Sequence, residues 1–269
     1  MGRKLDEPAV ADAYNLALEL EESGDIEGAV AALKAYLELD PQDHGGAAVR
    51  LAALERGAVP AKAPDSYVEV LFDQHADAFE DILVEQLGYD VPNLVRKKLD
   101  ALGLGPFERV LDLGCGTGLA AEALRDRVTD MIGIDISSRM IDICEDKDIY
   151  EGLYCGEVEE FLADNDEEQF DLITACDVLP YLGELDPLFE GAADNLVPGG
   201  LLVFSSETLG DMGGRPFRVA PHQRFVHAAD YVQACLADAG FEIVAMDDIN
   251  VRMQDGRPTP GHLVVARLG

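Results

Sequence analysis

The chain lacks the residue spacings that hold most structural metals and disulfide frameworks. Its 269 residues contain five cysteines, an odd number with no Cys-x-x-Cys pair. Its five histidines show neither His-x-x-x-His nor His-Glu-x-x-His spacing. We therefore predict no metal site, and we interpret the cysteines as reduced, small apolar side chains in a reducing compartment.

Long apolar runs are also missing. No stretch approaches the roughly 18 consecutive apolar residues that a membrane-spanning helix needs. The charged first ten residues, MGRKLDEPAV, have no apolar segment typical of a signal peptide. These absences predict a cytoplasmic protein without a membrane partner.

Positive charge is scarce, because 20 Lys and Arg residues stand against 53 Asp and Glu residues, a formal net charge of −33. An acidic protein of this kind repels nucleic-acid phosphates and anionic membrane surfaces, so neither is an expected partner. The basic run Arg96, Lys97 and Lys98 is short, and we interpret it as the solvated end of a helix.

The first 57 residues predict a separate helical unit. Two amphipathic segments, residues 7–23 and 26–40, are separated by Gly-Asp. Their small, large and breaker positions resemble a tetratricopeptide repeat: Ala13, Leu16, Ala17, Leu20, Gly24, Ala29, Leu33 and Pro41. Two positions depart from that family, since Tyr36 replaces the usual alanine and Ala13 a frequent tryptophan. One repeat cannot bury its own apolar face, so the unit is expected to pack on the rest of the chain or on a protein partner.

Composition changes after this unit. Residues 58–66 are rich in proline and alanine without periodicity, which predicts a linker. Residues 67–99 predict helices broken near Gly88 to Pro92, and strand and helix patterns alternate afterwards. We therefore predict a second, α/β domain over residues 67–269.

The segment RVLDLGCGTGLAAEAL, residues 109–124, predicts a buried strand, a turn and a helix. Glycines stand at alternate positions of the turn, where open α/β sheets bind ligands: Gly114, Gly116 and Gly118. The third glycine comes too early for the Gly-x-Gly-x-x-Gly pattern of dinucleotide sites. Asp112 would repel a pyrophosphate, but its carboxylate suits the amino group of an aminoacyl nucleoside.

This stretch resembles the first motif of class I S-adenosylmethionine-dependent methyltransferases, whose usual form is close to VLDLGCGTG. The resemblance extends over about residues 67–269. It implies S-adenosylmethionine as cofactor and a doubly wound, seven-stranded, mostly parallel Rossmann-like sheet, here with a small N-terminal α-helical unit. The combination is similar to a group of bacterial predicted methyltransferases that carry a tetratricopeptide repeat.

Later motifs follow in that family's order. The segment DMIGIDIS predicts a second strand ending in Asp135, which can accept hydrogen bonds from both ribose hydroxyls. Glu157 stands after a weak third strand, where the family usually has an aspartate near the adenine amino group. The resemblance implies a cofactor site made of Asp112, Gly114, Cys115, Gly116, Gly118, Leu119, Asp135, Ile136, Met140, Glu157, Val158, Cys176 and Asp177.

The methyl acceptor is expected above the strand ends, in contact with Phe72, Phe79, Tyr181 and Arg224. For the two phenylalanines the i, i+7 spacing favours core packing over stacking on a substrate, although the resemblance places their helix as a lid over the cofactor. The loop from Glu207 to His227 carries three arginines and two histidines in an otherwise acidic chain, which favours an anionic or carboxylate-bearing acceptor. The alternative is that these arginines pair with nearby acids. His227 is the candidate general base, with a structural role at a helix end as the alternative.

Together these features predict in-line methyl transfer to a small molecule. A general base is needed only if the acceptor is a poor nucleophile. The alternative function is a protein methyltransferase or cofactor-binding adaptor whose helical unit recruits a protein.

Overall fold

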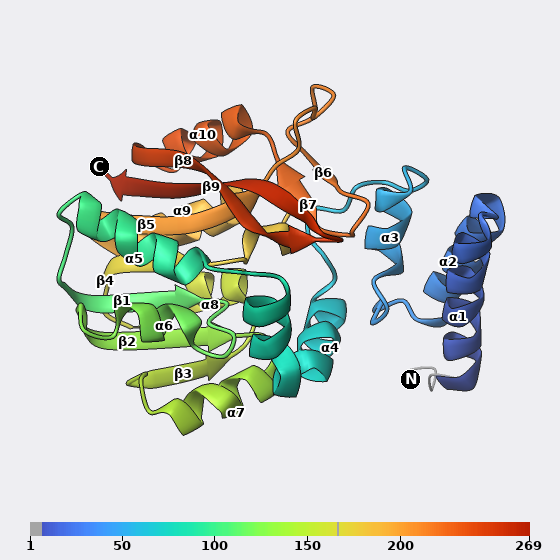
Figure 1. Ribbon diagram of the computed structural model, residues 1–269, viewed down its shortest axis with the longest axis horizontal. Coiled ribbons are helices and arrows are strands. Elements are labelled where there is room, and N and C mark those ends of the chain that lie inside the picture. The colour runs from blue at the N-terminus through green and yellow to red at the C-terminus, as the bar shows by residue number, and fades with distance from the viewer. Residues whose placement is uncertain (1–6, 166) are drawn as a thin grey trace.

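A seven-stranded sheet covered by helices on both faces forms the centre of the computed structural model, which describes residues 7–165 and 167–269 (Figure 1). The strand order is β3-β2-β1-β4-β5-β9-β8. The first five strands run parallel, whereas β9 is antiparallel to β5 and to β8. Their bounds are β1 Phe107–Leu113, β2 Val128–Asp135, β3 Gly152–Cys155, β4 Phe170–Ala175, β5 Leu196–Glu207, β8 Phe241–Gln254 and β9 Arg257–Leu268. The expected fold class is confirmed.

Helices flank this sheet in the alternating order that parallel strands require. They are α4 Asp65–His75, α5 Val91–Ala101, α6 Leu119–Leu124, α7 Ser138–Lys147, α8 Val158–Asp164, α9 Asp186–Asn195 and α10 Ala229–Asp238. Short helical turns η1 Ala76–Ala78, η2 Asp81–Gln86 and η3 Leu179–Tyr181 join some of them. Within the described ranges, no helix combines the length and apolarity needed to cross a membrane.

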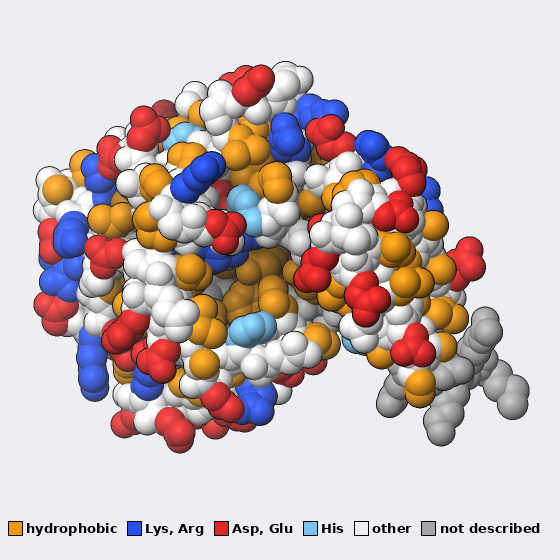
Figure 2. Space-filling model, turned by 45° about the vertical axis from the view of Figure 1, so that its right-hand side comes forward, with side chains coloured by type: hydrophobic (Ala, Val, Ile, Leu, Met, Phe, Trp, Pro, Cys, Tyr) orange, Lys and Arg blue, Asp and Glu red, His pale blue; other side chains and the backbone are white. Residues whose placement is uncertain are grey.

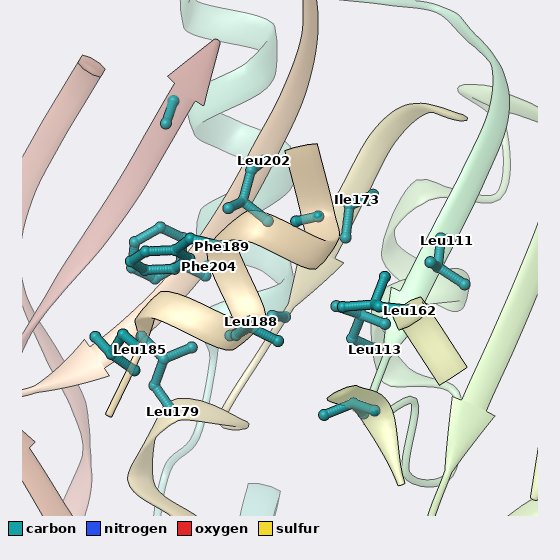
Figure 3. Close-up of a cluster of buried hydrophobic side chains, with 14 of the residues drawn as sticks. Leu111, Leu113, Leu162, Ile173, Leu179, Leu185, Leu188, Phe189, Leu202 and Phe204 are labelled. Atoms are coloured by element: carbon teal, nitrogen blue, oxygen red, sulfur yellow. The ribbon is translucent and has the colours of Figure 1, made fainter. Parts of the chain in front are cut away.

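The period of two in the strands divides the core between the faces of the sheet. Leu111 and Leu113 of β1 point to one face, where α8, α9 and α10 pack (Figure 3). Val110 points to the other face, against α5 and α6. Continuous apolar strands are what a sheet buried on both faces needs. This arrangement fixes the strand ends, and therefore the turns that follow them.

Three helices precede the sheet domain: α1 Glu7–Ser23, α2 Ile26–Leu39 and α3 Ala47–Ala53. The first two form a hairpin that shares an apolar cluster with α3 (Figure 1). The other side of α3 packs on a small two-stranded sheet, β6 Phe217–Val219 with β7 Phe225–His227. There, Val49 and Ala52 contact Val219 and Phe225. The unit therefore buries apolar surface against its own chain, and its assignment as a tetratricopeptide repeat stays a prediction.

The expected linker is partly ordered by hydrogen bonds. Gly183 and Glu184 donate their backbone N–H groups to Ala61 O at 2.7 and 2.8 Å, and Ala63 N donates to Tyr181 O at 2.8 Å. Lys62 forms an antiparallel bridge with Leu182. We call residues 61–65 the strap; its last residue begins α4. The proline- and alanine-rich composition had no periodicity, so this pairing was not expected from the sequence.

Candidate active site

The glycine turn lies between β1 and α6. Gly114, Gly116 and Gly118 all have positive φ, at 62°, 55° and 89°. A Cβ at Gly114 would lie 2.6 Å from Val178 Cγ2, so this position has no room for a side chain. The turn is also tied to β2, because Cys115 N donates to Ile134 O at 2.9 Å. Backbone conformation and close approach thus explain the glycines that the sequence pattern singled out.

A pocket opens at this turn, at the C-terminal ends of β1 to β4. It encloses about 910 Å³, part of which is open to solvent. On the face shown in Figure 2, the surface is hollowed between the sheet domain and the N-terminal unit, with hydrophobic side chains inside. Most residues expected at the site line this pocket: Phe72, Phe79, Asp112, Gly114, Cys115, Gly116, Leu119, Asp135, Ile136, Glu157, Val158, Cys176, Asp177 and Tyr181.

Four expected residues do not line the pocket. Gly118 is the N-cap of α6, where its left-handed backbone conformation ends the turn and begins the helix. Met140 is fully buried in α7. Arg224 and His227 are buried behind the pocket wall, and their contacts are described below.

Asp112 is a buried carboxylate at the pocket floor, with 1% of its surface exposed. It accepts hydrogen bonds from the Tyr150 hydroxyl and from Thr174 Oγ1, each at 2.8 Å. Burial raises the pKa of Asp112 to about 6, although the two hydrogen bonds act in the opposite direction. The carboxylate therefore lacks a neutralising cation in the described structure, and a ligand cation would be well placed there.

Asp135 closes β2 and is bound to the turn. Its carboxylate accepts the Gly116 N–H at 2.8 Å and the Ser137 N–H at 2.9 Å. Burial raises the pKa of Asp135 to about 6, and these N–H groups counteract the rise. Each oxygen keeps a lone pair for a further donor.

Glu157 is the N-cap of α8, where its side chain accepts the Glu160 N–H at 2.8 Å. Its other oxygen lies 3.4 Å from Lys62 Nζ. The strap cation thus contacts a carboxylate that follows β3 and lines the pocket.

Aromatic side chains cover another part of the pocket. Phe72 stands edge-on to Phe79 at 6.0 Å and to Tyr181 at 5.3 Å between ring centroids. Tyr89 also lines the pocket, and none of the described residues hydrogen-bonds its hydroxyl. Burial raises the pKa of Tyr89 and of Tyr181, so both phenols stay protonated near neutral pH. They are hydrogen-bond donors, not bases.

Arg224 is held by carboxylates. Its Nε donates to Glu207 at 2.8 Å, one terminal nitrogen donates to the Tyr181 hydroxyl at 2.9 Å, and the other donates to Asp177. Burial alone would raise the pKa of Glu207, but Arg224 and neighbouring cations lower it to about 2. Protein partners thus take three of the five N–H groups of this guanidinium, and Arg224 is only 5% exposed.

The other basic side chains of the Glu207–His227 loop have acidic partners as well. Arg215 and Arg218 lie 3.8 and 3.6 Å from Glu55, and His222 lies 3.1 Å from Glu207. The structure shows the pairing alternative, and the expected cluster of free cations facing the acceptor is not formed. Charge composition could not reveal this, because Glu55 belongs to the N-terminal unit.

His227 ends β7 in a fully buried position. Its Nε2 donates to Leu182 O at 2.9 Å, and its ring stacks on Tyr231 with 6.2 Å between centroids. Burial lowers the pKa of His227 to about 4. A neutral histidine outside the pocket does not have the position of a general base, and the geometry favours the structural alternative.

Comparison with known proteins connects this geometry with a family. A family model described as Methyltransferase domain matches residues 86–246, which is more than half of the chain. The chain belongs to this methyltransferase family.

Curated relatives match parts of this chain. The ubiquinone biosynthesis O-methyltransferase of Chelativorans sp. (strain BNC1) is 35% identical over 102 residues, which cover 36% of this chain and 40% of that protein. The protein of the same name from Idiomarina loihiensis is 26% identical over 174 residues, 58% of this chain and 69% of that protein. The chain spans about two fifths of the length of the first relatives it matches.

Solved structures share the fold. A S-adenosylmethionine-dependent methyltransferase from Clostridium acetobutylicum ATCC 824 has a TM-score of 0.55 at 19% identity, and the match covers 74% of this chain and 99% of that one. The N-methyltransferase NodS from Bradyrhizobium japonicum WM9, in complex with S-adenosyl-L-homocysteine, has a TM-score of 0.51 at 21% identity. This match covers 65% of this chain and 85% of that one.

The sequence missed several pocket residues of the methyltransferase. Lys62, Ala63 and Asp65 come from the strap, and Tyr89 from the turn before α5. A basic residue in a segment rich in proline and alanine was the available signal for Lys62. No signal singled out Tyr89, which lies within the predicted helix break.

Proposed function

We propose that this methyltransferase binds S-adenosylmethionine and transfers its methyl group to a small molecule. One observation carries the proposal: the glycine turn and the buried carboxylates Asp112 and Asp135 line the same pocket. The family match and the O-methyltransferase names of the curated relatives support it.

The residues present fit this cofactor. A Cβ at Gly116 would lie 3.6 Å from Phe79 Cε1, so glycine keeps the space between the turn and the ring open. Apolar side chains with a few buried polar groups line the pocket, which is the usual lining of a small-molecule site. We assign Asp112 to the ammonium group, Asp135 to the ribose hydroxyls, and Glu157 with Val158 to the adenine.

When bound, the cofactor supplies a methyl group on a positively charged sulfur, which is already a good leaving group. The chain's task is therefore to align the acceptor and to exclude water. Phe72, Phe79 and Tyr181 close the apolar side of the pocket. The protonated hydroxyl of Tyr89 can donate a hydrogen bond to an acceptor oxygen and so hold it in line.

The charges of the pocket favour an uncharged acceptor. Five carboxylates line the described pocket, whereas Lys62 is its single cation and lies 3.0 Å from Asp65. An anion would meet no unpaired cation there. We therefore propose an uncharged acceptor with an apolar or aromatic body, in place of the anionic acceptor expected from composition. Its hydroxyl oxygen takes the methyl group and releases its proton to water at the solvent-open side of the pocket.

Calorimetric titration tests cofactor binding. We expect S-adenosylhomocysteine to bind, and Asp135→Ala to weaken it by about 1 to 3 kcal/mol through lost ribose hydrogen bonds. Equal affinity in the variant would remove Asp135 from the site. Comparably strong NAD binding would overturn the cofactor assignment.

A further inference from the structure

The strap lines the pocket and contacts two groups of strand-end residues. Its backbone pairs with the segment after β4, through Ala63 N to Tyr181 O and the bridge between Lys62 and Leu182. The Lys62 side chain extends toward the segment after β3. Both Tyr181 and Leu182 line the pocket, as do Lys62 and Ala63. The strap is therefore part of the pocket wall.

Lys62 is surrounded by carboxylates. Its Nζ lies 3.0 Å from Asp65, 3.4 Å from Glu157 and 3.7 Å from Glu159. Burial alone would lower the pKa of Lys62, but these neighbours raise it, so the ammonium stays charged. Burial raises the pKa of Glu159, and the nearby Glu157 adds to the rise while Lys62 opposes it. Without this cation, the carboxylates would repel one another.

We propose that Lys62 is a positioning residue of the cofactor site, which fixes Glu157 at the adenosine end and makes the strap a wall of that end. The inference rests on the proposed function. Only 10% of the Glu157 side chain is exposed, and both of its oxygens are engaged, one by the Glu160 N–H and one by Lys62. Removing the ammonium leaves the Glu160 N–H as the partner of Glu157, while the neighbouring Glu159 repels it and favours a shift away from the pocket.

The strap also joins the site to the N-terminal unit. Ala63 is buried in the same cluster as Val49 and Ala52 of α3. Immediately beyond the strap, Ser66 Oγ donates to Gln42 O in the unit. Order at the adenosine end and docking of the helical unit thus depend on the same short segment.

Calorimetry on full-length variants tests the role of Lys62. We expect Lys62→Met to weaken S-adenosylhomocysteine binding about tenfold, as for a lost charged hydrogen bond. Methylthioadenosine, which lacks the amino-acid end, should lose the same factor. Lys62→Arg should restore most of the affinity, since it keeps the charge. Lys97→Met is the matched control, because Lys97 is an exposed cation 3.4 Å from Asp90.

Asp112→Asn locates the effect within the pocket. This substitution should lower the affinity for S-adenosylhomocysteine and leave the affinity for methylthioadenosine unchanged. A defect at the adenosine end should instead lower the affinity for both ligands. Unchanged affinity of Lys62→Met for both ligands, with binding by the wild type, overturns the role of Lys62 alone. If Lys62→Met lowers the affinity for S-adenosylhomocysteine alone, the role of Lys62 at the adenosine end is overturned too. If the wild type binds neither ligand, the proposed function fails instead.

Hydrogen exchange of the wild type keeps the test independent of variant folding. We expect S-adenosylhomocysteine to slow exchange of the Ala63 amide, which donates to Tyr181 O. Unchanged exchange at saturating ligand would contradict the strap as a wall of the site.

Discussion

Two buried carboxyls, Asp112 and Asp135, give cofactor binding a pH dependence. Burial raises the pKa of each from 3.8 to about 6. Between pH 3.8 and about 6, the folded, ligand-free protein therefore keeps these two carboxyls protonated, whereas the unfolded chain has released the protons. Proton binding stabilises the folded state at low pH, and this stabilisation is lost as pH rises through about 6. Ligand ammonium and ribose hydroxyl groups need the ionised form.

Cofactor affinity should consequently rise with pH. Below pH 6, protonation of each required carboxylate should lower the affinity for S-adenosylhomocysteine by up to about tenfold per pH unit. Titrations between about pH 5 and about pH 8 measure this directly. Asp112→Asn should make the affinity for S-adenosylhomocysteine less dependent on pH. Affinity that does not change with pH would remove both carboxylates from the ligand.

His227 should affect stability and leave turnover chemistry unchanged. Burial lowers the pKa of His227 from 6.5 to about 4. Between these two pH values the imidazole is protonated in the unfolded chain and neutral in the folded protein. Between these values stability should fall with decreasing pH, by up to about 1.4 kcal/mol per unit. His227→Gln should lose this component in denaturant unfolding and keep the wild-type pH profile of turnover. A turnover profile changed by the substitution would restore His227 as a candidate base.

At the scale of elements, the β1–α6 turn depends on glycine backbone and on close packing. Gly114→Ala should weaken S-adenosylhomocysteine at least about tenfold, because strain and displacement of Val178 disturb the pocket. Gly103→Ala is a matched control, since Gly103 has φ +66° but open space around its Cβ position. Equal ligand affinities of the two variants would show that the clash at Val178 has no effect on the site.

The loop between β5 and β7 depends on Arg224. Arg224→Met should cost about 3 to 5 kcal/mol of folding free energy, because Glu207 and Asp177 lose their buried partner. Arg218→Met, which removes a more exposed ion pair with Glu55, should cost less than about 1 kcal/mol. Urea unfolding compares them. A stable Arg224→Met with a raised KM for the acceptor would favour the original expectation of substrate contact.

The sequence predicted the elements well where a local pattern determines the structure. Strand periodicity and the glycine spacing placed Asp112 and Asp135 at adjacent strand ends, and the pocket contains both. Arg224 and His227 were placed in the site because a long loop that gathers basic residues in an acidic chain favours binding of an anionic acceptor. Their partners, Glu207 and the Leu182 carbonyl, come from other parts of the chain, so local pattern carried no sign of their burial.

At the scale of the whole molecule, the N-terminal unit and the methyltransferase domain share buried surface. The sequence predicted that the unit must cover its apolar face, and Val49 does so against Val219 and Phe225. It did not reveal that the intervening segment lines the pocket, because Lys62 and Glu157 are distant in sequence. Packing of α3 on its own chain gives the unit a structural role, and recruitment of a protein target stays the alternative prediction.

Turnover with S-adenosylmethionine tests the proposed methyl transfer to a small molecule most directly. The full chain is incubated with a panel of uncharged aromatic alcohols and phenols, carboxylic acids and amines, and release of S-adenosylhomocysteine is followed with the mass of each acceptor. We predict release that depends on an uncharged acceptor, which gains one methyl group on oxygen. Methylation confined to carboxylate-bearing acceptors or to proteins, or no acceptor-dependent release at all, would contradict the account.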